Sequence, residues 1–209
     1  MTEVFELMKE AASKNGNTAD WAAELQQLRV LVAKQELNEN MIRYCRGMDR
    51  KDLDLVKSTY WPEATEDHGM FVGLSHDFCD WAYSMRRESA HKASHYVTNI
   101  LIELNGNQAR RETAFIYLAM PADGGPTDLL LGRYRDLCER RQGEWKVLAR
   151  TCVWDGAQRL APEADVAELF GIPPTSNFGD RYPHDPTYAT DWGKAAPVQT
   201  TNAKEHLND

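Results

Sequence analysis

Four polar residues stand in stretches whose apolar pattern predicts burial, and together they could move protons. Tyr44 and Asp49 close the first predicted helix, His95 begins the first long predicted strand, and Arg150 lies inside the last one. A histidine exchanges protons near neutral pH, and a neighbouring carboxylate fixes its tautomer. A tyrosine hydroxyl and an arginine can stabilise an oxyanion or help a leaving group depart. The set suits proton abstraction followed by elimination or isomerisation, which needs no cofactor.

Each of these residues also has a purely structural interpretation, which the sequence leaves open. Asp49 could cap the next helix, His95 could bond to backbone in a half-buried strand, and Tyr44 could be a core aromatic residue. Inside an apolar strand Arg150 needs a partner, and a structural ion pair would serve as well as a ligand. Strict alternation places Asn99 on the same strand face as His95, where it could position a substrate or bridge strands.

Common cofactor and nucleophile motifs are missing from the chain. It has no glycine-rich phosphate loop, no HExxH pair, no close cysteine–histidine cluster and no GxSxG elbow. We therefore expect neither a metal nor an organic cofactor. Four widely spaced cysteines form no CxxC pair, which indicates structural thiols in a reducing compartment: Cys45, Cys79, Cys138 and Cys152.

Charge and length narrow the classes of partner. The 209 residues carry 32 acidic and 24 basic side chains, a formal net charge of −8. Such a field disfavours nucleic acids and anionic membranes as partners. No apolar run approaches the roughly 18 residues of a membrane span, and the first ten residues lack a basic-then-apolar signal layout. We expect a cytoplasmic protein with its own hydrophobic core.

Hydrophobic spacing predicts helices first and strands afterwards. A long helix runs from Asp20 to about Asp49, a short one follows with Asp52 as its cap, and a third runs from Ser75 to about Arg87. Alternating β-branched and aromatic residues then predict antiparallel strands, with hairpin turns at 105–106 and 142–143. The predicted strands are a short one at 68–73 and long ones at 94–104, 108–120, 129–141 and 144–154.

This segregation of helices and strands indicates an α+β fold. We divide the chain into an N-terminal extension (1–19), a catalytic domain (20–155) and an irregular C-terminal arm (156–209). The arm is rich in Pro, Asn, Asp, Thr and Tyr.

Three runs of residues resemble the SnoaL-like branch of the NTF2-like superfamily. They are MIRYCRGMDRKD at 41–52, HYVTN at 95–99, and GRYRD with ERRQGEWK leading to Arg150. Within that branch the chain resembles the group of scytalone dehydratase, lindane dehydrochlorinase and bile acid 7α-dehydratase. The resemblance implies an NTF2-like (cystatin-like) cone, in which a curved antiparallel sheet wraps around N-terminal helices and a deep pocket. It also favours a homotrimer.

The resemblance assigns roles to the candidate residues. Asp49 and His95 match a shared catalytic pair, with His95 as general base. Arg150 matches a functional arginine that would stabilise negative charge, Tyr44 would serve as acid or hydrogen-bond donor, and Glu112 is a candidate for a second acid. Residues expected to position the substrate or form the pocket wall are Asn99, Trp61, Phe71, Phe78, Trp81 and Tyr117.

The expected activity is that of a cofactor-independent lyase acting on a hydrophobic aromatic or polycyclic small molecule. Dehydration is the leading reaction in this interpretation. A related C–C cleavage, such as loss of formaldehyde from a lignin-derived diarylpropane in aromatic compound catabolism, would use the same residues. Two alternatives stay open because the superfamily hosts many functions: an isomerase or polyketide cyclase, and a non-catalytic ligand-binding module.

Overall fold

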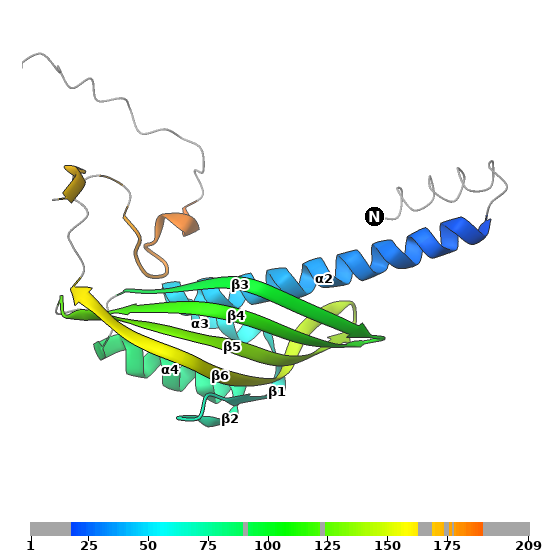
Figure 1. The fold of residues 1–209 in the computed structure, drawn as a ribbon, viewed down its shortest axis with the longest axis horizontal. Helices are drawn as coiled ribbons and strands as arrows, with labels where there is room; N and C mark the ends of the chain where they lie inside the picture. The colour runs from blue at the N-terminus through cyan, green and yellow to red at the C-terminus, as the bar shows by residue number, and fades with distance from the viewer. Residues whose placement is uncertain are drawn as a thin grey trace, which may run out of the picture.

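The protein forms an α+β cone in which a curved sheet wraps around helices (Figure 1). The computed structural model describes residues 18–89, 92–121, 124–162, 169–173, 176 and 178–189. Three α-helices lie against one face of a six-stranded sheet with the order β2-β1-β6-β5-β4-β3. The elements are α2 (Thr18–Arg50), α3 (Leu53–Ser58), β1 (Tyr60–Asp67), β2 (Val72–Leu74), α4 (Ser75–Ser89), β3 (Lys92–Asn105), β4 (Gln108–Met120), β5 (Pro126–Arg141), β6 (Glu144–Pro162) and the 3-10 helix η1 (Pro186–Tyr188).

Helix α2 packs one apolar stripe against the sheet. Leu37, Met41, Tyr44 and Met48 recur every three or four residues and are buried, which is the spacing of one helical face. The predicted long helix is therefore confirmed, and its burial fixes the position of the C-terminal end that carries the candidate site residues. None of the helices in the described residues is long and apolar enough to cross a bilayer.

Asp52, and not Asp49, caps the next helix. Helix α2 continues to Arg50 and ends where Lys51 adopts a positive φ of 56°. The Asp52 carboxylate then accepts a 3.1 Å hydrogen bond from the backbone N–H of Leu55. The predicted cap of α3 is confirmed, and the interpretation of Asp49 as a helix cap is wrong.

The predicted meander of four long antiparallel strands is confirmed as β3 to β6. The turn between β5 and β6 is Gln142-Gly143, and both residues have positive φ, as a tight two-residue hairpin requires. The turn between β3 and β4 lies one residue later than predicted. It is formed by residues 106–107, because Asn105 pairs with Gln108.

The sequence patterns do not predict strand β1. This strand lies parallel to β6, with an irregular register between Tyr60 and Thr65. The irregularity falls around Pro62, which has no N–H to donate to a regular ladder. The short strand expected at 68–73 is instead β2, which pairs with the end of β1 after a tight turn.

The sheet extends beyond the predicted domain end at residue 155. Strand β6 runs to Pro162, and its last residues pair with the beginning of β5 from Pro126 onward. The predicted start of the irregular arm at Gly156 therefore lies inside a strand. Residues 1–17 of the predicted extension and residues 190–209 of the arm lie outside the described residues.

A buried arginine–aspartate cluster fills the inner face of the sheet at one end. Asp136 on β5 accepts hydrogen bonds from Arg150 on β6, at 2.7 and 2.9 Å, and from Arg111 on β4, at 2.9 and 2.6 Å. Burial opposes the charge of Asp136, but the two guanidinium groups outweigh it and lower the pKa of this carboxyl. The structural interpretation of Arg150, an ion pair inside an apolar strand, is confirmed.

The same cluster ties the sheet to helix α2. The Arg111 guanidinium donates hydrogen bonds to the backbone carbonyl of Leu37 and to the side chain of Asn40. Asn40 in turn donates to the carbonyl of Thr59 at the beginning of β1. Arg150 also donates to the Tyr60 hydroxyl at 2.9 Å. One carboxylate thus organises contacts that join three strands and the long helix.

All four cysteines are buried free thiols, as expected of structural residues. Burial raises the pKa of Cys45, Cys79 and Cys152 to about 12 and that of Cys138 to about 11. A thiol that stays protonated is a poor nucleophile. We therefore assign these cysteines to packing.

We predict that Asp136→Asn destabilises the fold by about 3–5 kcal/mol, because two buried guanidinium groups lose their shared carboxylate. Urea denaturation followed by circular dichroism measures the loss. The matched control is Asp155→Asn, which removes an exposed carboxylate paired with Arg133 and should change the midpoint little. Equal stability of the two variants would contradict the organising role of Asp136.

Candidate active site

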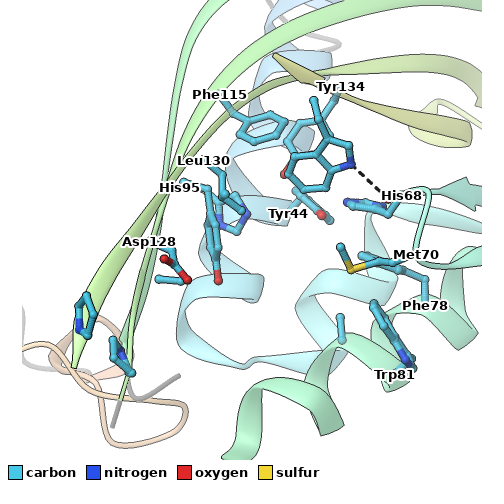
Figure 2. A pocket seen from close by; sticks show the side chains of 16 residues that line it. Tyr44, His68, Met70, Phe78, Trp81, His95, Phe115, Asp128, Leu130 and Tyr134 are labelled. Carbon is cyan, nitrogen blue, oxygen red and sulfur yellow. Dashed lines mark hydrogen bonds between the residues drawn. The ribbon is translucent and has the colours of Figure 1, made fainter. Parts of the chain in front are cut away.

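A cavity of about 300 Å³ lies between the sheet and the helices. Its walls come from helix α2, helix α4, strands β3 to β6, the turn after β1 and the loop between β4 and β5. Figure 2 shows the side chains that converge on it. The lining residues are Tyr44, His68, Met70, Phe78, Trp81, Ala82, His95, Phe115, Tyr117, Ala119, Pro121, Pro126, Asp128, Leu130, Tyr134 and Trp154.

The structure brings Asp49 and His95 together at the wall of this cavity. Asp49 Oδ1 lies 2.5 Å from His95 Nδ1, and Asp49 Oδ2 accepts a 2.9 Å hydrogen bond from the His95 backbone N–H. One carboxylate therefore holds both the ring and the main chain of the histidine. The His95 side chain is only 3% exposed and packs against the Tyr117 ring at 4.5 Å. Nδ1 is the ring nitrogen that faces the carboxylate.

Two tyrosines stand beside this pair. Tyr44 comes from α2, one and a half turns before Asp49, and its ring lies 6.2 Å from that of His95. Tyr134 of β5 lies edge-on to Tyr44 at 5.6 Å. Burial raises the pKa of Tyr134 well above its ordinary 10.0, so this hydroxyl stays protonated. Both phenols line the cavity.

Arg150 lies behind the tyrosines and does not line the cavity. Its guanidinium stacks on the ring of Tyr44 at 4.1 Å and on that of Tyr134 at 4.4 Å. Burial would lower the pKa of Arg150, but the contact with Asp136 outweighs it and raises the pKa well above its ordinary value. Arg150 was expected to stabilise negative charge on a substrate, but the rings of Tyr44 and Tyr134 stand between its guanidinium and the cavity.

Asn99 faces away from the cavity, contrary to expectation. Strand β3 contains a bulge: Val97 pairs with Phe115, but the next partners are Ile100 and Thr113. The extra residue breaks the alternation. Asn99 is therefore exposed, and it does not share the face that carries His95.

Three further expected residues lie elsewhere. Trp61 is on the opposite side of β1 from the inward-facing residues, where it bonds to the Glu139 carbonyl at 3.0 Å and stacks with Arg141. Phe71 packs on Phe78 and Trp81 but does not line the cavity. Glu112 is on the outer face of the sheet, 3.6 Å from Arg133, because it alternates with inward-facing neighbours.

Phe78, Trp81 and Tyr117 line the cavity as expected, but much of its wall is not predicted from sequence. Phe115 stacks on Tyr134 at 4.4 Å. Gly132 makes this stack possible, since a Cβ there would lie 2.6 Å from the Phe115 ring. The alternation along β4 and β5 could have indicated that Phe115 and Tyr134 face inward. His68 and Met70, in the turn after β1, lie outside any periodic pattern that could have indicated them.

No group of three His, Cys, Asp or Glu side chains that could hold a metal ion occurs in the part of the chain that the structure describes. The lining is aromatic and apolar apart from a few convergent polar groups, which is typical of a site for an organic small molecule.

The family described as SnoaL-like domain matches residues 29–151, more than half of the chain. The comparison of this chain with curated proteins found no match. A hexachlorocyclohexane dehydrochlorinase of type 2 superposes with a TM-score of 0.61 at 20% identity, over 72% of this chain and 99% of its own. A type 3 enzyme from Novosphingobium barchaimii gives 0.58 at 21% identity, over 68% and 98%.

A candidate scytalone dehydratase from Novosphingobium aromaticivorans also shares the fold. Its TM-score is 0.57 at 17% identity, over 65% of this chain and 97% of its own. At these sequence identities, the structural similarity to the three proteins establishes the fold alone. The matched family and these folds confirm the resemblance on which the sequence analysis relied.

Beyond the matched residues, the segment 178–189 packs on the end of α2. The Tyr182 N–H donates to the Arg50 carbonyl at 2.7 Å, and Arg50 Nε lies 3.0 Å from Asp185 Oδ2. The Asp185 carboxylate also accepts hydrogen bonds from the N–H groups of Asp180 and Thr187. The segment thus holds the helix end that carries Asp49.

We predict that Asp185→Asn loosens this segment. Burial would raise the pKa of Asp185, but hydrogen bonds from Thr187 and Asp180 and the charge of Arg50 outweigh it, so the pKa lies below its ordinary 3.8. The stabilisation is therefore present above pH 3.8 and lost as the pH falls through the lowered value. Hydrogen exchange at neutral pH should be about tenfold faster in peptide 178–189 of the variant. The control Asp180→Asn, whose carboxylate is exposed, should exchange like the wild type; equal acceleration in both would contradict the assignment.

Proposed function

Because the chain belongs to the SnoaL-like family, we propose that it is a cofactor-independent lyase acting on a hydrophobic aromatic small molecule. The observation that carries this proposal is the Asp49–His95 pair at the wall of an aromatic cavity. The dehydrochlorinases and the candidate dehydratase that share the fold are named for eliminations. An elimination begins with removal of a proton, which is what such a pair supports.

In this proposal His95 is the general base. Asp49 holds Nδ1 at 2.5 Å, fixes the tautomer and stabilises the imidazolium that forms when Nε2 takes a proton. Because the ring and its backbone N–H bind the same carboxylate, the histidine is held in one orientation. Removing a positioned base of this kind costs about 10²- to 10⁴-fold in rate.

Tyr44 donates a hydrogen bond to the substrate in the same proposal. Its ring is held between the Arg150 guanidinium and the neighbouring tyrosines. Arg150 is then a positioning residue, which acts through the ring of Tyr44. Tyr134, whose hydroxyl stays protonated, is a second donor at the same wall. Donors aimed at developing negative charge stabilise an enolate-like transition state.

The lining favours a flat aromatic substrate. Phe78, Trp81, Phe115, Tyr117 and Trp154 supply aromatic surface around a cavity of about 300 Å³. That volume accommodates a compound of one or two rings, at the small end of ligand cavities. Dehydration, or loss of another neutral fragment such as formaldehyde from a diaryl compound, fits the same proton-moving residues.

Assembly as a homotrimer, which the family resemblance implies, belongs to the same proposal. So do a cytoplasmic location and a role in aromatic compound catabolism. Light scattering on the purified protein tests the trimer, for which a monomeric mass would be the contrary result.

We predict that the wild-type protein, stripped of metal, releases a neutral fragment from members of a panel of hydroxylated diaryl, steroid and naphthol compounds, followed by mass spectrometry. Asp49→Asn and His95→Ala should lower the rate by about 10²- to 10⁴-fold, because the base loses its orienting partner or is absent. The control is His76→Gln, a histidine that bonds to the Lys57 carbonyl outside the cavity. A product of unchanged mass would indicate an isomerase or cyclase, and full activity in both site variants would overturn the proposed base.

A further inference from the structure

A second histidine faces the cavity from the side opposite His95, across Tyr44 (Figure 2). His68 lies in the turn after β1, and its ring stacks flat on Phe78 with centroids 4.2 Å apart. Its main chain is fixed as well, because the Trp154 indole donates to the His68 carbonyl at 3.2 Å. His68 is buried and held in one place, yet no step described so far uses it.

A fully buried carboxylate stands behind this histidine. Glu66 Oε1 lies 3.1 Å from His68 Nδ1, and the Glu66 side chain has no exposed surface. Alternation along β1 puts residues 66 and 68 on the same inward face. Among the described residues, neither the Glu66 oxygens nor His68 Nδ1 has a hydrogen-bond partner, so the two groups meet as a close ion-pair contact. A buried carboxylate needs a cation or donor, and His68 is the group within reach.

Glu66 stands apart from the arginine–aspartate cluster. Glu66 is the register partner of Arg150 across β1 and β6, while Asp136 alone is shared by Arg150 and Arg111. His68 is the imidazole that Glu66 contacts, at 3.1 Å.

We infer that His68, held by Glu66, is the general acid that protonates the leaving group, and that this group is therefore a hydroxyl. The inference rests on the proposed lyase function and names its substrate class. Chloride departs without a proton, whereas hydroxide is a poor leaving group that requires one. A second carboxylate–histidine pair opposite the base has a use only in the second case.

The step balances without any further reactant. The substrate Cα–H bond breaks and its proton goes to Nε2 of His95, while the electron pair forms the new double bond. The Cβ–O bond breaks with its electron pair on oxygen, and that oxygen takes the proton from Nε2 of His68. Water and the unsaturated product leave, and exchange with solvent returns the proton from His95 to His68.

Two probes with one common product test this assignment. β-Hydroxypropiophenone gives phenyl vinyl ketone by loss of water, and β-chloropropiophenone gives the same ketone by loss of hydrogen chloride. The rate of product formation is measured from the absorbance of phenyl vinyl ketone, after subtraction of the uncatalysed rate. We expect His68→Gln and Glu66→Gln to lose about 10²-fold or more with the hydroxy ketone and to stay within a few-fold of the wild type with the chloro ketone. His76→Gln is the matched control, and it should match the wild type on both.

The outcomes separate the two proposals. Equal losses on both ketones, or none on either, would overturn the role of His68 and leave the lyase standing. If His95→Ala keeps its activity on the chloro ketone, the proposed base is wrong while His68 stands. If the wild type converts neither, both proposals fail. Nitrogen NMR of the folded variants is independent of turnover: Glu66→Gln should shift the His68 ring proton away from Nδ1, and an unchanged spectrum would contradict the pair.

Discussion

The carboxylate of Asp136, shared by Arg111 and Arg150, is the interaction on which the rest of the structure depends. A buried charge cluster is stable only when every member finds a partner, and here the partners come from three strands, helix α2 and the start of β1. The cluster therefore sets the distance between helix and sheet. It also presents Arg150 to the back of Tyr44 and Tyr134, so the cavity has a polar base hidden beneath an aromatic surface.

Irregularities in the sheet decide which side chains reach the cavity. The bulge in β3 keeps His95 inside and turns Asn99 out. A bulge in β6 likewise puts Arg150 on the inner face together with Trp145 and Val147. Each of these two bulges shifts the alternation by one residue, so a single inserted residue changes which functional group faces a ligand.

The cavity joins two carboxylate–histidine pairs that face each other across Tyr44. One is built from the end of α2 and the start of β3, the other from the end of β1. The fold is shared with proteins named for loss of chloride and for loss of water, so the cone alone does not choose the chemistry. The polar side chains that line it do, and in this chain we propose that they provide a base on one wall and a proton donor on the other.

Sequence alone determined the helices and the four long strands, because local hydrophobic periods and turn residues act over a few positions. The pairing of Asp49 with His95 was implied by the resemblance of the sequence motifs to those of the family. The sequence also identified Phe78, Trp81 and Tyr117 for the wall. Only the tertiary structure decided that Arg150 binds Asp136 behind the cavity wall and that Asn99 and Trp61 face away. It also decided that the turn after β1 brings His68 to the cavity, with Glu66 behind it. These outcomes depend on pairing between strands distant in the chain and on bulges, and neither leaves a mark in local periodicity.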